Sequence, residues 1–279
     1  MSPKILDGKA LAQKIKRELA EEVKTMTTRP GLAVILVGDN PASRVYVTSK
    51  RKDCEECGFY SEEYTLPAAT DPAQLFDLID VLNHRADIDG ILVQLPLPAQ
   101  FDEKQVLLAI DPDKDVDGFH PINVGRLVTG DSCFLPCTPA GVMELLEEGG
   151  VELAGKHCVV LGRSNIVGKP QALLMLQKDA TVTICHSKTP DMALECRRAD
   201  VLVSAVGKTG LVTPDMVKDG AVIVDVAMNR DENGKLCGDC CRETYEKSSC
   251  YTPVPGGVGP MTRAILMKNT LRAAKLHGK

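Results

Sequence analysis

Short, unbroken apolar runs recur along the chain and alternate with stretches of helical periodicity. Parallel strands that are covered by helices on both faces are apolar throughout, because neither face meets water. The stretch 10–23 places apolar residues every three or four positions, which is the spacing of one helix face. This alternation predicts an α/β fold. The expected strands are 32–37, 60–66, 89–93, 158–161, 181–185, 201–205 and 221–226. The expected helices are 10–23, 72–83, 101–110 and 137–148, with others beginning at Pro41 and after Thr262, and one that has Pro170 in its first turn.

The segment after the first buried strand carries the first candidate chemistry. Asp39 or Asn40 can cap a helix there, and Pro41 suits its first position. That helix carries Tyr46 and Lys50, which are four residues apart and therefore share a face. The pair either meets a ligand at the carboxyl edge of the sheet, or is a surface pair in which the lysine stem packs on the tyrosine ring.

A second group of candidates follows the strand 89–93. Gln94 is at its carboxyl end, and the prolines within 94–98 keep that segment extended. Four carboxylates then occur between residues 111 and 117, without the final glutamate that a calcium loop requires. Most of them are expected to be turn formers and caps. Asp117, beside Gly118, is the candidate for ligand contact, and a plain turn is the alternative.

The stretch 158–170 has the pattern of a strand, a tight turn and a helix start. Gly162 lets the backbone turn without a Cβ clash, and Gly168 lets the helix lie close to the strand. Pro170 fits the first helical turn. The unpaired amides of a helix N-terminus suit a phosphate. Because Ser164 replaces the middle glycine of the usual G-x-G-x-x-G, the turn alone is consistent with a nucleotide site or with a plain connection.

The tip of the next strand bears on the choice of cofactor. Residues 186–188 follow that strand, at the place that faces the adenine ribose in a dinucleotide fold. An NAD site favours Asp or Glu there, whereas this chain offers the Ser187 hydroxyl and the Lys188 amine, with Arg163 nearby in the first turn. These groups favour NADP over NAD. The alternative is that both cations are solvated surface charges.

Three further segments are expected to matter. The ends of two later strands, at 206–208 and 227–229, would border the cofactor. Residues 252–262, rich in Gly and Pro, should form a fixed backbone that precedes the last helix and faces a ligand between the domains. Thr138 is expected to cap the helix 137–148.

Composition narrows the class of protein. Two domains are expected for 279 residues, because single cores stop growing near this size. A net charge of −5 and the scarcity of aromatic residues disfavour a nucleic-acid partner. No apolar run approaches membrane-spanning length and the N-terminus lacks a signal-peptide pattern, so a cytoplasmic protein without a membrane partner is expected.

The eleven cysteines should stay reduced in the cytoplasm. Cys54 with Cys57, and Cys237 with Cys240, have the spacing of metal-ligand pairs. The first pair falls within a helical pattern, and the two pairs are far apart along the chain. They are interpreted as small buried hydrophobes, so no metal is expected, and zinc is the minor alternative.

Five segments together resemble the bifunctional methylenetetrahydrofolate dehydrogenase/methenyltetrahydrofolate cyclohydrolase family, in the family's order and over nearly the whole chain. They are 46–50, 94–98, 114–121, 162–170 and 253–262. The resemblance implies two α/β domains with a cleft between them. A folate-binding catalytic domain would cover 1–119, completed by a helix at 261–277, and a Rossmann-like NADP-binding domain would cover 120–260. Family members are usually homodimers, which is the expected state here.

The resemblance also implies four catalytic residues. Lys50 would be the central cyclohydrolase residue, and Gln94 would hydrogen-bond to it and help set its state. Tyr46 would pack on the aminobenzoyl ring of the folate, and Asp117 would bind the pterin.

Other residues are implied as ligand contacts. Tyr46, Gln94, Leu95, Asp117 and Pro260 would touch the folate substrate. Gly162, Arg163, Ser164, Ser187 and Met228 would hold the cofactor. The cysteines near 237–241, where members often have aliphatic residues, indicate a variation in packing.

The implied reaction is the NADP-dependent oxidation of 5,10-methylene-tetrahydrofolate to the 5,10-methenyl cation, followed by hydrolysis to 10-formyl-tetrahydrofolate. Hydride transfer moves no proton, so it needs alignment and no acid or base. Hydrolysis requires water to lose a proton, and a lysine in a closed cleft beside a cation should have a depressed pKa and act as the base. A monofunctional dehydrogenase, an NAD-dependent member and a non-catalytic folate-binding protein are the alternatives. A short-chain dehydrogenase is disfavoured because its Tyr–Lys pair would follow the nucleotide turn.

Overall fold

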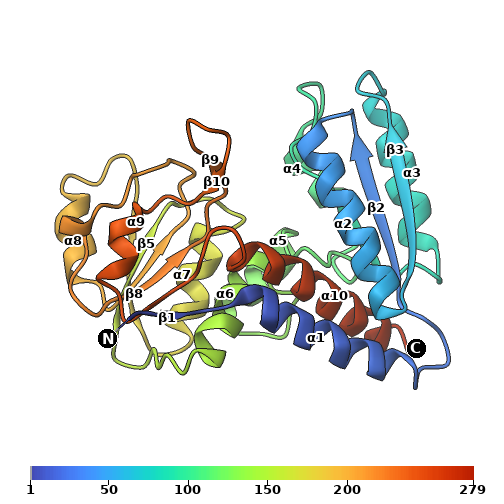
Figure 1. Cartoon of the computed structure of the whole chain (residues 1–279). Coiled ribbons are helices and arrows are strands. Elements are labelled where there is room, and N and C mark those ends of the chain that lie inside the picture. Colours follow the sequence, from blue (N-terminus) through green and yellow to red (C-terminus); the bar gives the residue numbers. More distant parts are fainter. Residues whose placement is uncertain (1) are drawn as a thin grey trace. The chain divides into compact units, whose positions relative to one another are not determined.

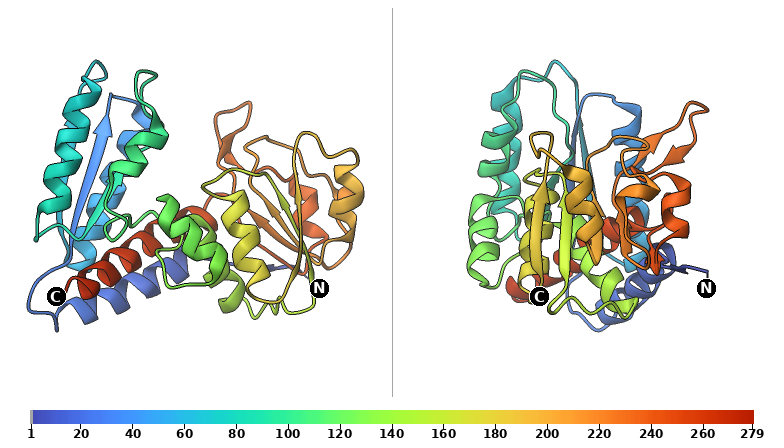
Figure 2. Two further views of the ribbon diagram at one scale, coloured as in Figure 1. Left: turned by 180° about the vertical axis from the view of Figure 1, so that it is seen from behind. Right: turned by 90° about the vertical axis from the view of Figure 1, so that its left-hand side faces the viewer.

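The computed structural model describes residues 2–279, apart from the side chain of Ala42, and contains two compact units (Figures 1 and 2). One unit comprises the residues up to Ala12 together with Pro136–Thr262. The other comprises Gln13–Leu135 together with Arg263–Lys279. We name them by their main sheets: the six-stranded unit and the three-stranded unit.

The three-stranded unit is built on a parallel sheet in the order β3-β2-β4. All seven residues of the central strand are buried, as its unbroken apolar sequence predicts. Helices α3 and α4 cover one face through an apolar cluster, and α2 packs against β2 and β3 (Figure 1). The strands are β2 (Gly31–Val37), β3 (Tyr60–Leu66) and β4 (Gly90–Val93). The helices are α2 (Pro41–Cys57), α3 (Pro72–His84), α4 (Glu103–Ala109) and α5 (Pro121–Thr129).

The six-stranded unit has the parallel strand order β1-β11-β8-β7-β5-β6. Its strands are β1 (Lys4–Ile5), β5 (His157–Leu161), β6 (Thr181–Cys185), β7 (Val201–Ser204), β8 (Val222–Asp225) and β11 (Cys250–Tyr251). Its helices are α6 (Cys137–Glu148), α7 (Gly168–Leu176), α8 (Met192–Arg198), the short η1 (Pro214–Met216) and α9 (Arg242–Glu246). A small antiparallel hairpin is formed by β9 (Asn229–Arg230) and β10 (Leu236–Cys237).

Two long helices contribute residues to both units. They are α1 (Gly8–Val23) and α10 (Val258–Leu276). The predicted division at 1–119 and 120–260, with the helix 261–277 joining the first domain, stays a prediction. Within the described residues, no helix is long and apolar enough to cross a membrane.

The α/β class and the predicted strands are confirmed, and three local expectations are wrong. The helix expected at 101–110 begins at Glu103, because the Asp102 carboxylate accepts hydrogen bonds from the Lys104 and Gln105 amides and caps it. Thr138 lies inside α6 and is not its cap; its hydroxyl bonds that of Thr262 at 2.9 Å.

The third correction concerns the last helix. It begins at Val258 and not after Thr262, so the second half of the Gly/Pro-rich segment is helical. A Cβ at Gly257 would lie 2.8 Å from the Thr252 Cβ, so the chain is tightly folded just before the helix starts.

Candidate active site

The lysine predicted to be catalytic is held at the carboxyl edge of the three-stranded sheet. Lys50 lies on α2 with only 9% of its surface exposed, and its Nζ donates to Gln94 Oε1 at 2.9 Å. Gln94 follows β4 directly, and its own Nε2 donates to the Leu95 carbonyl at 2.7 Å. Because that bond fixes which amide atom faces each partner, the oxygen is the atom presented to the lysine. The interpretation of Lys50 as a solvated surface lysine is therefore wrong.

Helix α2 is fixed at both ends of its functional face. The Asn40 side chain accepts from the Ser43 amide at 3.3 Å, which confirms the predicted cap. Three residues beyond Lys50, the buried Asp53 carboxylate binds Lys16 Nζ at 2.8 Å and an Arg263 guanidinium nitrogen at 2.7 Å. Removing one partner from a buried ion pair typically costs about 3–5 kcal/mol, so this network fixes α2 firmly.

Tyr46 lies one turn before Lys50 on the same helix and is 38% exposed. Its exposed ring and the buried lysine thus share one face of α2, as the four-residue spacing predicts.

Asp117 is placed by a segment that docks against β4. Ile91 N donates to the Lys114 carbonyl, and Ile91 bridges Asp115 in parallel register. A Cβ on Gly90 would lie 2.7 Å from the Val116 side chain, so only glycine permits this close approach. The segment runs in the direction of β4 and brings Asp117, which is half-buried, toward the same edge as Gln94.

Asp115, two residues before this candidate, holds the turn, as expected for most of the four acids. Asp115 is 1% exposed and accepts from the His120 amide at 2.8 Å, the Phe119 amide at 3.2 Å and Asn123 Nδ2 at 2.9 Å. Burial raises its pKa to about 6, although these hydrogen bonds act in the opposite direction. The run of four acids gave no signal that would separate this structural acid from the others.

The predicted nucleotide turn lies at a topological switch point of the six-stranded sheet. β5 pairs with β6 on one side and with β7 on the other, and the chain passes from β5 to β6 before it crosses to β7. Open α/β sheets bind ligands outside the carboxyl ends of the strands at such a point. The turn that begins at Gly162 follows β5 there.

Two glycines of this turn are required by close packing. Gly162 has a φ of +109°, and a Cβ there would lie 2.5 Å from the Ala205 carbonyl oxygen. A Cβ on Gly168 would lie 2.3 Å from the Gly162 carbonyl oxygen, which confirms that this glycine lets α7 approach the strand. The Ser164 Oγ accepts from the Val167 amide at 3.1 Å and from the Gly168 amide at 3.2 Å. Its hydroxyl hydrogen can still be donated to an anion.

The remaining predicted cofactor residues are exposed and lie at carboxyl ends of strands. Arg163 follows β5, Ser187 follows β6, and Met228 follows β8 with 46% of its surface exposed. Pro260, predicted as a folate contact, lies in the first turn of α10 and belongs to the six-stranded unit. Its role, like those of the other site residues, stays a prediction.

Comparison with known proteins finds one family whose two domains match the two parts of this chain. Residues 6–117 match the tetrahydrofolate dehydrogenase/cyclohydrolase catalytic domain, and residues 136–278 match the NAD(P)-binding domain of the same family. The chain belongs to the tetrahydrofolate dehydrogenase/cyclohydrolase family.

Individual relatives are similar over their full length. The bifunctional protein FolD of Ruminiclostridium cellulolyticum is 58% identical over 281 residues, which cover 99% of both chains. The crystal structure of bifunctional FolD methylenetetrahydrofolate dehydrogenase/cyclohydrolase from Campylobacter jejuni superposes with a TM-score of 0.97, at 52% identity and 99% coverage of both chains. The Trypanosoma brucei enzyme, solved with NADP cofactor and an inhibitor, superposes with a TM-score of 0.94 at 41% identity, over 99% of this chain and 98% of that one.

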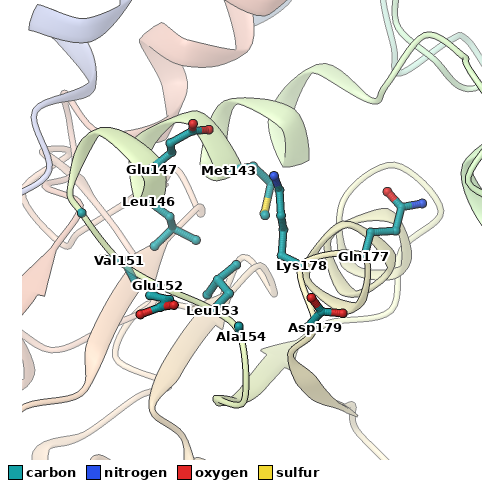
Figure 3. A pocket seen from close by; sticks show the side chains of 11 residues that line it. Met143, Leu146, Glu147, Val151, Glu152, Leu153, Ala154, Gln177, Lys178 and Asp179 are labelled. Atoms are coloured by element: carbon teal, nitrogen blue, oxygen red, sulfur yellow. The ribbon is translucent and has the colours of Figure 1, made fainter.

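A pocket of about 460 Å³ lies in the six-stranded unit (Figure 3). Residues 150–154, which lead into β5, and 177–179, which lead into β6, form part of its wall. It is therefore at the amino edge of the sheet, opposite to the strand ends where dinucleotides bind. Figure 3 shows the Lys178 side chain running toward Met143 within it. None of the predicted site residues lines this pocket.

The cysteine pair on α2 is part of the core of this family member. Cys54 Sγ lies 3.7 Å from Met267 Sδ, and Cys57 Sγ lies 3.8 Å from the Lys16 carbonyl oxygen. Burial raises the pKa of each thiol to about 12, so both stay protonated and behave as small hydrophobes.

Proposed function

We infer that this chain is a bifunctional enzyme that oxidises 5,10-methylene-tetrahydrofolate with NADP and then hydrolyses the 5,10-methenyl product to 10-formyl-tetrahydrofolate. The observation that carries the inference is the part-buried contact between Lys50 Nζ and Gln94 Oε1, in a chain that also has a glycine-lined turn at a switch point. The family match and the full-length similarity to bifunctional FolD proteins support both activities.

The dinucleotide fits the residues present. The switch-point turn has no side chain at Gly162 or Gly168, and the helix N-terminus behind it suits a phosphate. Arg163, Ser187 and Lys188 are exposed and offer donors to a 2′-phosphate, with no carboxylate in the 186–188 turn to oppose it. When bound, NADP supplies the hydride acceptor. The chain's contribution to this step is to align the two ligands, because no proton moves.

In the hydrolysis step, Lys50 Nζ accepts the proton of the attacking water. In its neutral form, Lys50 donates one N–H to Gln94 Oε1 and keeps its lone pair for the attacking water, whose proton it accepts at Nζ. The bond between the one-carbon unit and the ring nitrogen N5 then breaks, and N5 leaves with the proton that Nζ returns. Gln94, fixed by its bond to the Leu95 carbonyl, orients the amine. Both features are those expected of a positioned general base.

The other side chains of the three-stranded unit bind the substrate in this proposal. The Asp117 carboxylate offers two acceptors to the paired N–H donors of the pterin. The exposed Tyr46 ring covers the aminobenzoyl group, and Leu95 adds a contact. Pro260, which belongs to the six-stranded unit, is proposed as a further contact.

We further propose that the enzyme acts as a homodimer in the cytoplasm and needs neither nucleic acid nor a membrane. The eleven cysteines are all outside disulfide bonds, as in a reducing compartment, and the net charge is −5. Light scattering coupled to size exclusion tests the dimer; a single peak at 30.1 kDa would contradict it.

One spectrophotometric assay tests the function. Purified protein is mixed with methylene-tetrahydrofolate and NADP, and absorbance is followed at the NADPH and methenyl wavelengths, with a parallel reaction containing NAD. The bifunctional enzyme produces NADPH while added methenyl-tetrahydrofolate disappears faster than in a protein-free blank. A monofunctional enzyme leaves the methenyl signal at the blank rate, and a non-catalytic binder changes neither signal.

A further inference from the structure

A fully buried carboxylate holds the loop that follows β7. Asp239 is 0% exposed, and its Oδ2 accepts from Ser204 Oγ at 2.8 Å, from Val206 N at 2.9 Å and from Gly207 N at 3.3 Å. Its Oδ1 accepts from Lys208 N at 2.7 Å and from Asn229 Nδ2 at 3.0 Å. Three consecutive backbone amides, those of residues 206–208, thus converge on one carboxylate. We call these residues the 206–208 loop. Their amides form an anion-binding nest, and the anion bound in it is the Asp239 side chain.

This loop is the second wall of the switch-point crevice. β7 is the neighbour of β5 on the side away from β6, so the 206–208 loop and the Gly162 turn flank the same strand ends. The two walls touch, since a Cβ on Gly162 would lie 2.5 Å from the Ala205 carbonyl oxygen. The Val206 side chain is 46% exposed, and Gly207 and Lys208 are exposed as well.

The orientation of the amides determines what the loop offers a ligand. The C=O and N–H of a trans peptide point in opposite directions. Because the N–H groups of 206–208 point at Asp239, the preceding carbonyls of residues 205–207 point away from it. The Ala205 carbonyl packs against Gly162, so the loop presents the Val206 and Gly207 carbonyls as acceptors, and no amide for a phosphate. Hydroxyl and amide donors are the groups it can bind.

Asp239 is itself fixed by a second buried acid. The Asp225 carboxylate, at the end of β8, accepts from the backbone amides of Asp239 at 3.0 Å and Cys240 at 2.8 Å. It also accepts from the Tyr245 hydroxyl at 2.8 Å. A Cβ on Gly238 would lie 2.1 Å from Asp225 Oδ2, so only glycine permits this approach. The two acids act in series: Asp225 holds the backbone of Asp239, whose side chain holds the loop.

We propose that Asp239 is a positioning residue for NADP, which shapes the 206–208 loop into an acceptor-lined wall for the nicotinamide half of the cofactor. The proposal rests on the proposed function. The adenine half is assigned to the β6 side of the Gly162 turn, so the β7 side receives the nicotinamide half. Its ribose hydroxyls and carboxamide NH₂ are donors, which match the outward carbonyls. Asp239 touches no ligand itself.

Asp239→Asn tests this with little change in shape, because it replaces one acceptor oxygen by an NH₂ that faces backbone donors. Binding is measured by titration with NADP and, separately, with adenosine 2′,5′-bisphosphate, which carries only the adenine half. We expect the NADP Kd to rise at least tenfold while the Kd of the fragment changes less than twofold. A general weakening of the fold would raise both constants together.

Control variants distinguish a displaced 206–208 loop from a general loss of fold stability. Asp200→Asn removes another acid of the same sheet, which accepts from the His157 amide at 2.8 Å at the opposite edge of the sheet; it should lower Tm without raising the NADP Kd. If Asp239→Asn does not fold, Ser204→Ala decides, because it deletes one donor and keeps the carboxylate. We expect it to raise the NADP Kd two- to fivefold.

Two results would overturn the proposal. One is a folded Asp239→Asn variant, or a Ser204→Ala variant in its place, whose NADP Kd stays within twofold of wild type. The other is an equal loss of affinity for NADP and for the adenine fragment. Wild-type protein that binds NADP without oxidising methylene-tetrahydrofolate would instead refute the proposed function, and the titrations would still decide the role of Asp239.

Discussion

The two units build their candidate chemistry in opposite ways. In the three-stranded unit, the central groups are side chains fixed on or directly after regular elements: Lys50 is buried on α2, and Gln94 follows β4. In the six-stranded unit, the predicted contacts Arg163, Ser187 and Met228 are exposed residues of turns, and buried acids beneath them hold backbone in place. Proton transfer needs one amine at a fixed position, whereas a dinucleotide is bound by many weaker contacts from backbone and surface groups.

The largest effect should come from the buried amine. Lys50→Met should reduce the rate of methenyl-tetrahydrofolate hydrolysis about 10²- to 10⁴-fold, the usual contribution of a positioned base, and should affect hydride transfer less. Both rates are measured by absorbance. Lys52→Met, an exposed lysine of the same helix, is the control and should change neither rate. Retention of both activities by Lys50→Met would refute the role given to this residue.

The next effect concerns the acid that supports the Asp117 turn. Asp115 has a folded-state pKa of about 6 against an ordinary value of 3.8, so its contribution to stability is fully present below about pH 4 and is lost as pH rises through 6. We therefore compare the free energy of unfolding of wild type with that of Asp115→Asn. The difference, wild type minus variant, should fall by about 3 kcal/mol as pH rises from 4 to 7, because each unit of pKa difference corresponds to about 1.36 kcal/mol.

Urea unfolding of both proteins between pH 4 and pH 7 measures this difference. The exposed Asp113→Asn is the matched control from the same segment and should give a flat difference. A flat difference for Asp115→Asn as well would show that Asp115 is already ionised across the range.

A smaller effect is expected from the close approach of α7. Gly168→Ala places a Cβ 2.3 Å from the Gly162 carbonyl oxygen, so backbone must shift, at a typical cost of about 1–3 kcal/mol. Tm should fall and NADP affinity should weaken, while hydrolysis of added methenyl-tetrahydrofolate persists. Gly125→Ala is the control in α5, where nothing lies within 4 Å of the added methyl, and it should be neutral or slightly stabilising.

The smallest effect is expected from an exposed cation. Arg163→Ala should lower kcat/KM with NADP about tenfold, as expected for one charge-assisted hydrogen bond, and should leave kcat/KM with NAD nearly unchanged. Arg197→Ala, an exposed arginine in the last turn of α8, is the control. An equal loss with both cofactors would place Arg163 at the pyrophosphate, and no loss would make it a solvated surface charge.

Regular elements were predictable from the sequence because their signals are local. The apolar runs identified the buried strands, and the Asn40–Pro41 cap identified the start of α2. Gly168 was interpreted correctly because a helix that follows a strand so soon must pack against it. The pairing of Lys50 with Gln94 came from the family resemblance, because 44 residues separate the two in sequence.

The supporting acids were not predictable, because their partners are backbone amides brought together by the fold. Asp115 is one of four acids in the same turn, and its sequence position does not distinguish it from the others. Asp239 lies between Cys237 and Cys240, a segment that was interpreted only as a variation in packing. The Thr138 cap failed for a related reason: its hydroxyl pairs with Thr262, which is 124 residues away. Side chains that serve distant backbone leave no periodic pattern in the sequence.

The most direct test of the account compares Lys50→Met and Asp239→Asn in the same two assays, NADPH formation and hydrolysis of supplied methenyl-tetrahydrofolate. We expect Lys50→Met to reduce the rate of hydrolysis far more than the rate of hydride transfer. We expect Asp239→Asn to reduce the rate of hydride transfer at limiting NADP far more than the rate of hydrolysis. If either folded variant lost both activities in equal proportion, the division of roles between the two units would be contradicted.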